Sequence, residues 1–121
     1  TPIWSLMDFR YFKIEDFACS ETGENGIQPE FVSALDDLRH ECGFPFVVTS
    51  GFRSTDHSIE KTKKIGGQHT HGNAADIQVT NGLQRMAIVS KALEHGFTGL
   101  GIAKSFVHLD TRDSEPVMWT Y

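Results

Sequence analysis

The sequence has 121 residues, a formal net charge of -5 and a hydrophobic fraction of 39% that includes nine phenylalanines. This length suits one domain with a single core, so we expect one domain over residues 1–121, and a monomer. Acidic and basic residues are mixed, without the basic stripe of nucleic-acid binders, and no apolar run is long enough to span a membrane.

The N-terminal segment contains apolar residues, but Asp8 and Arg10 interrupt it. It lacks the basic start and the continuous apolar middle of a signal peptide, so none is expected. Cys19 and Cys42 stand outside any CxxC or CxH pattern. Two cysteines are too few for a disulfide framework, which favours reduced thiols and argues against a cysteine zinc site.

The clearest predicted helix runs from Pro29, which suits a first turn, to Cys42, with Gly43 ending it. Residues 44–52 (FPFVVTSGF) are β-branched and aromatic and predict a buried strand. A long polar loop follows over about residues 54–72, and loops of this length in small domains are usually functional.

Residues 73–79 predict a short strand, and Asn81 is expected to cap a second helix. That helix carries Met86, Val89 and Leu93 on one face. Residues 98–103 and 105–110 then predict two antiparallel strands. The elements show no regular βαβ alternation, so we expect an α+β fold with a small antiparallel sheet and flanking helices.

The segment from His69 to Asp76 carries the first chemical pattern, a histidine and an aspartate seven residues apart. Ile77 and Val79 would face the core, so alternation directs Asp76 to the opposite side of its strand. An aspartate among small residues needs a cation or several donors to offset its desolvation. A metal shared with His69 would meet that need, although such a pair alone is more often a surface loop.

The second pattern lies on the strand that ends at Asp110. Alternation places His108, Asp110 and Arg112 on one face of this strand, with Val107 and Leu109 on the other. Two histidines and one aspartate make a three-ligand zinc set that leaves the fourth position for water, as catalytic sites do. Bound zinc lowers the pKa of its water to about 7, which gives a nucleophile at neutral pH.

Three blocks, SGFRS (50–54), HTHGNAAD (69–76) and FVHLD (106–110), resemble the zinc D-Ala-D-Ala carboxypeptidases and their endopeptidase relatives. Those enzymes share a fold with the amino-terminal signalling domain of hedgehog proteins. The FAC…TG segment (17–23) and the ECGFP segment (41–45) extend the resemblance to about residues 17–119. Members close to this arrangement include cell-wall endopeptidases and bacteriophage endolysins.

The resemblance implies that His69, Asp76 and His108 bind one Zn²⁺ ion. Arg53 falls on the arginine that binds a substrate carboxylate or polarises its carbonyl, a task that suits the guanidinium fork. The alternative for Arg53 is a surface salt bridge. We also place His57, in the same loop, among the substrate-binding candidates.

This sequence departs from the family pattern at two positions, Gly67 and Ser105. Gly67 replaces a serine, and Ser105 replaces the acidic base that many relatives carry three residues before the last ligand. Asp110 is then the first candidate for the catalytic base, with support of a ligand or of Arg112 as its equally weighted alternative. His57 and His71 are further candidates.

The expected function is zinc-dependent hydrolysis of peptide bonds in bacterial peptidoglycan stems or cross-links. A carboxypeptidase that trims terminal D-Ala and a non-catalytic zinc-binding module are the alternatives. Action at the bacterial cell wall or periplasm is expected, with synthesis in the cytoplasm and release during phage lysis as one route. That localisation rests on family analogy alone.

Overall fold

The computed structural model describes residues 9–19, 21–52 and 68–121 of the chain. Two α-helices, three short 3₁₀ helices and five strands lie in this part. In chain order they are η2 (Ile14–Phe17), α1 (Pro29–Cys42), β1 (Val48–Ser50), η4 (Gln68–His71), β2 (Ala74–Gln78), α2 (Gly82–Ala92), η5 (Leu93–His95), β3 (Gly99–Ile102), β4 (Phe106–Asp110) and β5 (Val117–Thr120).

The first helix, α1, has the bounds that the sequence predicts. Pro29 occupies its first turn, where a missing N–H costs nothing, and Gly43 ends it in the left-handed conformation with a φ of 77°. Phe31, Leu35 and Leu38 recur at helical spacing and are buried. This apolar stripe fixes which side of α1 packs on the sheet.

The five strands form one sheet in the order β1-β2-β4-β3-β5. The pairs β1–β2, β2–β4 and β3–β4 are antiparallel, as expected for the strands around residues 98–110. The tail adds β5 parallel to β3, which the sequence did not predict. The fold class is therefore α+β, with a sheet that is antiparallel except at one edge.

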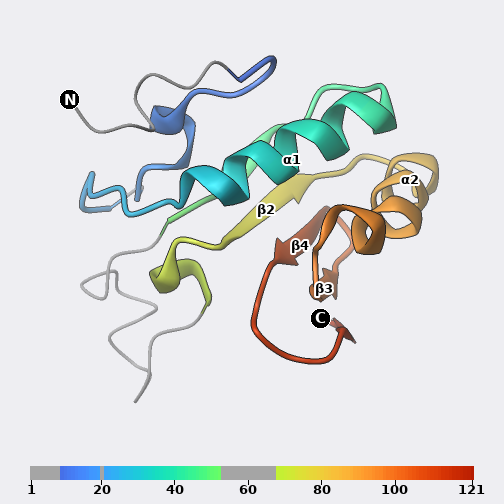
Figure 1. Cartoon of the computed structure of the whole chain (residues 1–121). Helices are drawn as coiled ribbons and strands as arrows, with labels where there is room; N and C mark the ends of the chain where they lie inside the picture. Colours follow the sequence, from blue (N-terminus) through green and yellow to red (C-terminus); the bar gives the residue numbers. More distant parts are fainter. Residues whose placement is uncertain (1–8, 20, 53–67) are drawn as a thin grey trace.

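Alternation along the strands gives the sheet one apolar face and one polar face. Both α1 and α2 lie over the apolar face (Figure 1). The side chains of Ile77, Val107 and Leu109 point there and are fully buried in a core shared with the helices. Asp76 and His108 lie at the alternate positions, so they belong to the face that the helices leave uncovered.

The expectation of a buried strand over residues 44–52 is wrong. The strand predicted over residues 44–52 is limited to Val48–Ser50 and lies at the sheet edge, where Thr49 is exposed. In α2 the buried residues are Ile88 and Ala92, whereas Met86 and Leu93 are more than half exposed. Because Met86 and Leu93 share a helical face, the sequence could not tell that this face turns away from the sheet.

Asn81 caps α2 as predicted, because its side chain accepts a hydrogen bond from the backbone N–H of Gln84. Within the described ranges, no helix combines the length and the apolar character that crossing a membrane requires. Cys19 and Cys42 are not joined by a disulfide.

Candidate metal centre

His69, Asp76 and His108 come together on the polar face of the sheet. Asp76 and His108 are direct cross-strand partners on β2 and β4, and His69 lies on η4, the turn that leads into β2. Their exposed fractions are 6%, 8% and 5% respectively. One candidate ligand atom from each residue lies within 4.8 Å of the other two.

A backbone carbonyl sets the orientation of His69. Its Nδ1 donates a hydrogen bond of 2.6 Å to the carbonyl oxygen of Gly51. The Nδ1 proton leaves Nε2 as the nitrogen available for a ligand bond, and Nε2 lies 3.4 Å from Oδ1 of Asp76. No sequence pattern pointed to Gly51, because a contact through a backbone carbonyl does not depend on residue type.

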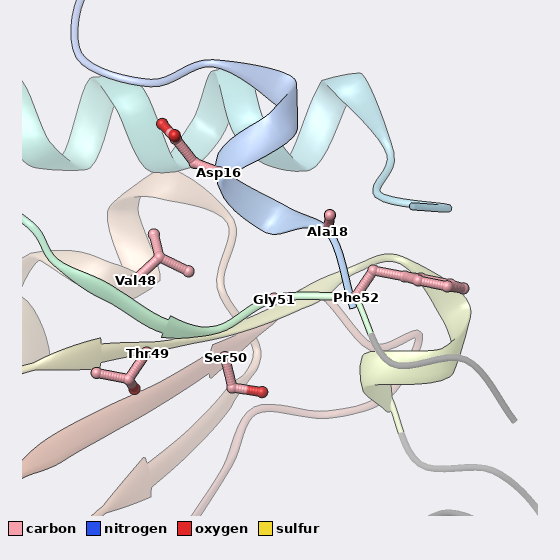
Figure 2. Close-up of a pocket in the computed structure, with 7 residues that line it drawn as sticks. All are labelled: Asp16, Ala18, Val48, Thr49, Ser50, Gly51 and Phe52. Carbon is pink, nitrogen blue, oxygen red and sulfur yellow. The ribbon is translucent and has the colours of Figure 1, made fainter. Parts of the chain in front are cut away.

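Gly51 is itself held in place by close packing at the sheet edge. A Cβ at this position would lie 2.7 Å from the Cα of Phe17, so only glycine fits. The next backbone N–H, that of Phe52, donates to the carbonyl of Phe17 at 2.7 Å. Figure 2 shows Gly51 and Phe52 running beside Ala18, around a cavity of about 210 Å³ that Asp16 also lines. The 3₁₀ helix η2 thereby positions the carbonyl that orients His69.

His108 contacts a carboxylate through each ring nitrogen. Nδ1 lies 2.9 Å from Oδ1 of Asp76, and Nε2 lies 2.7 Å from Oδ2 of Asp110. Nδ1 is thus on the side of Asp76, a member of the candidate ligand group, whereas Nε2 is on the side of Asp110. The ring can therefore present Nδ1 to a metal while Nε2–H donates to Asp110.

Asp110 is fully buried, and both of its oxygens are engaged. Nε and Nη2 of Arg112 donate to Oδ1 and Oδ2 at 2.9 and 2.7 Å, and the backbone N–H of Arg112 donates to Oδ1. Together with His108 these donors satisfy the carboxylate. The face predicted for His108, Asp110 and Arg112 is the one on which they lie.

The charged network shifts the pKa of each member in a consistent direction. Burial opposes ionisation of Asp76, but hydrogen bonds from His108 and His69 outweigh it and hold its pKa below the usual range. The same balance lowers the pKa of Asp110, through His108 and Arg112. Burial disfavours the charged ring of His108, yet Asp110 and Asp76 outweigh burial and raise its pKa.

The donor set at this site fits a divalent transition metal. Two imidazoles and one ionised carboxylate, on three separate elements, match the ligands that zinc takes in catalytic sites. A carboxylate with a lowered pKa is ready to bind a cation, and a second hydrogen bond fixes each imidazole. The residues present thus suit the metal that the sequence predicts.

In a comparison with protein-family models, residues 10–110 match the family described as Peptidase M15. The chain belongs to the Peptidase M15 family. Members of this family are metal-dependent peptidases, and the buried His-Asp-His group could bind a metal ion. Among curated proteins, none matches the chain significantly.

The remaining predicted residues of this M15 peptidase differ in what the structure says of them. Arg53, His57 and Gly67 lie outside the described residues. Ser105 is exposed and precedes β4. His71 is exposed at the end of η4 and is not a member of the buried group that His69 joins.

Trp119 is a neighbour of the site that the sequence analysis did not single out. Its ring centroid lies 5.2 Å from that of His108. It stands on β5, whose pairing with β3 was not predicted. The glycines at positions 99 and 101 were the available sign that large side chains pack over β3. On the neighbouring strand β4, Gly99 is paired with Asp110 and Gly101 with His108.

Proposed function

We propose that this M15 peptidase is a zinc enzyme that hydrolyses peptide bonds in bacterial peptidoglycan stem peptides or cross-links. The observation that carries the proposal is the buried group of His69, Asp76 and His108, whose ligand atoms lie within 4.8 Å of one another. Two imidazoles and a carboxylate favour Zn²⁺ over the oxygen-preferring Mg²⁺ and Ca²⁺.

In this proposal His69, Asp76 and His108 hold the ion, and each histidine is oriented by its other ring nitrogen. When bound, zinc would polarise the scissile carbonyl and activate a water molecule as the nucleophile. Arg53 would bind a carboxylate of the stem peptide, since a guanidinium fork matches a carboxylate, and His57 would be a second substrate-binding residue. These roles of Arg53 and His57 rest on the family resemblance.

The contacts of Asp110 favour support of His108 over the role of catalytic base. A base must reach the water or the substrate, whereas Asp110 is fully buried and both of its oxygens accept hydrogen bonds. His71 is the better candidate within the described residues. It is exposed and lines an open cavity of about 560 Å³ together with Asn73 and Arg112.

Two alternative functions would use the same metal site. Removal of a terminal D-Ala would make the protein a carboxypeptidase, and a zinc site without a working base would make it a binding module. The exposed Ser105, where many relatives carry an acid, keeps the second alternative open. Release at the cell wall during phage lysis is also part of the proposal, by analogy with endolysins.

The deciding experiment is digestion of purified peptidoglycan by the protein loaded with one equivalent of zinc. We expect cleavage that a chelator stops and added zinc restores, with fragments identified by mass spectrometry. Loss of cross-linked dimers would indicate an endopeptidase, and release of free D-Ala alone would indicate a carboxypeptidase. His69→Ala is the matched inactive control, since it removes one ligand and leaves the sheet unchanged.

Zinc bound at one equivalent with no chelator-sensitive cleavage of any peptidoglycan fragment would contradict the enzymatic proposal. It would favour the binding module. Failure of the wild-type protein to bind zinc would contradict the proposed site itself. The two outcomes are separated by measuring the metal content of the same sample by elemental analysis.

A further inference from the structure

Four strands place one row of residues at the same level across the polar face of the sheet. Asp76 on β2 is paired with His108 on β4, His108 with Gly101 on β3, and Gly101 with Trp119 on β5. Side chains at paired positions lie on the same face of a sheet. The row therefore runs from a proposed ligand to an indole ring, with a glycine between the two rings.

Because Gly101 has no side chain, the Trp119 ring can pack over β3 and contact His108. A Cβ on Gly101 would lie 2.7 Å from Nε1 of Trp119 and 2.8 Å from its Cε2, distances that no real side chain tolerates. The indole thus lies over the backbone of β3. Its ring centroid is 5.2 Å from that of His108, at an interplanar angle of 48°.

Gly99 provides the same space for Asp110, its partner across the β3–β4 pair. A Cβ on Gly99 would overlap the carboxylate of Asp110, which is fully buried and has no room to retreat. The alternating glycines of β3 are therefore explained by the two side chains that lie over them. Neither glycine has a positive φ, so close packing is the reason for both.

Arg112 closes this arrangement from the end of β4. Its Nε and Nη2 bind Asp110 side-on, and its guanidinium carbon lies 4.9 Å from the centre of the Trp119 ring. The backbone carbonyl of Arg112 also accepts a hydrogen bond of 2.6 Å from the hydroxyl of Thr98. A guanidinium held by a fork and by a stacked ring has little freedom to follow a substrate.

The charge balance explains why an arginine is needed. A ring that gives Nδ1 to a metal is neutral, so His108 can no longer compensate the charge of Asp110. The buried carboxylate then depends on Arg112, whose charge does not titrate near neutral pH. Arg112 would hold the Asp110 carboxylate in place, and Asp110 would accept a hydrogen bond from Nε2 of His108.

We propose that Asp110, Arg112 and Trp119 form a support layer over Gly99 and Gly101 that fixes the ring of His108 with Nδ1 toward Asp76. The proposal rests on the zinc site proposed above and assigns the three residues a positioning role, without substrate contact. It requires that substitutions in this support layer change the zinc affinity and the coordination geometry more than they change substrate binding.

The test measures metal binding directly in purified full-length variants. Arg112→Gln and Gly101→Ala should each weaken zinc binding by about 10–100-fold in competition with a chromophoric chelator, the range for lost outer-shell partners. The visible spectrum of the Co²⁺-substituted protein should change in both variants. Arg112→Lys, which keeps the charge but loses the fork, should recover only part of the affinity.

Gly82→Ala is the matched control, because a Cβ at this first residue of α2 meets nothing within 4 Å. It should keep the zinc affinity and the Co²⁺ spectrum of the wild-type protein. Gly101→Ala alters no polar group, so this variant still tests the support layer if Arg112→Gln proves unstable. The support layer is contradicted if Gly101→Ala matches Gly82→Ala in both measurements.

A second contradicting result is specific to Arg112. If Arg112→Gln raises KM for peptidoglycan fragments while the zinc affinity and the Co²⁺ spectrum stay unchanged, Arg112 binds substrate instead. Absence of zinc binding by the wild-type protein would overturn the proposed function and this inference together. Zinc binding by the wild-type protein with unaffected variants overturns the support layer alone.

Discussion

His69 and His71 stand two residues apart on η4, yet their surroundings differ completely. The ring of His69 is 6% exposed and bonded to the carbonyl of Gly51. The side chain of His71 is exposed, and only its backbone carbonyl is fixed, by a hydrogen bond from Gln28. His69 therefore belongs to the buried group that could hold a metal, whereas the side chain of His71 is open to solvent.

We predict that His71→Ala lowers kcat on peptidoglycan fragments by about 10²–10⁴-fold, the usual contribution of a positioned acid or base. Zinc affinity should stay unchanged, because His71 is outside the buried ligand group. Steady-state kinetics and chelator competition on the same sample measure the two effects. His40→Ala is the control, because His40 is also an exposed histidine but lies on α1. This variant should leave kcat and the zinc affinity unaltered. Full activity of His71→Ala would exclude His71 as the proton acceptor and make His57 the next residue to test.

At the residue scale, alternation predicted most of what the sequence could reveal. Which face Asp76, His108 and Asp110 share follows from a period of two, which needs no knowledge of the neighbouring strands. The contact of His108 with Trp119 depends on β5 lying two strands away from β4, and the only sign of it in the sequence was the pair of alternating glycines on β3. The Gly51 carbonyl was hidden, since any residue supplies one.

At the scale of elements, the turn from η4 into β2 sets the spacing between His69 and Asp76. Gly72 forms this turn with a φ of 74°, and a Cβ there would overlap the carbonyl oxygen of Gly26. The backbone N–H of Gln28 donates to the carbonyl of Gly72 at 2.8 Å. The segment before α1 thus holds the turn that joins the two proposed ligands.

We predict that Gly72→Ala destabilises the fold by more than the roughly 1–2 kcal/mol that a left-handed alanine costs, and also weakens zinc binding. Gly43→Ala isolates the conformational cost, because Gly43 has a φ of 77° and open space around it. Urea unfolding and chelator competition compare the two variants. Equal destabilisation, with zinc affinity retained in both, would show that the contact with Gly26 does not position the ligands.

Two features that the sequence did not determine share one physical cause. Helix α1 was predicted to the residue because proline, an apolar stripe and glycine act locally. The exposed face of α2 and the short edge strand β1 depend on which surfaces remain uncovered after the sheet assembles. Met86 and Leu93 have the same apolar character as core residues, so only the tertiary structure shows that they are exposed.

At the scale of the whole molecule, the buried charges couple folding to pH in the metal-free protein. The pKa values of Asp76 and Asp110 are lowered by folding, and that of His108 is raised. A lowered carboxylate pKa stabilises the fold above the unfolded value of about 4, and this gain is lost as the pH falls through the folded pKa. A raised histidine pKa stabilises the fold below about 6.5, and this gain is lost as the pH rises through the folded pKa.

We therefore predict that, with chelator present, the difference in unfolding free energy between the wild type and Asp110→Asn is largest between about pH 4 and 6.5. It should decrease toward acid, where Asp110 becomes protonated, and toward alkaline pH, where His108 loses its charge. On the alkaline side a part should remain, since Arg112 still pairs with Asp110 at 2.7 Å. Urea titrations across this pH range measure the difference, and a constant value from pH 4 to 8 would contradict the coupling. Zinc should remove the alkaline decrease, because a neutral His108 is then held in place by the metal instead of by its charge.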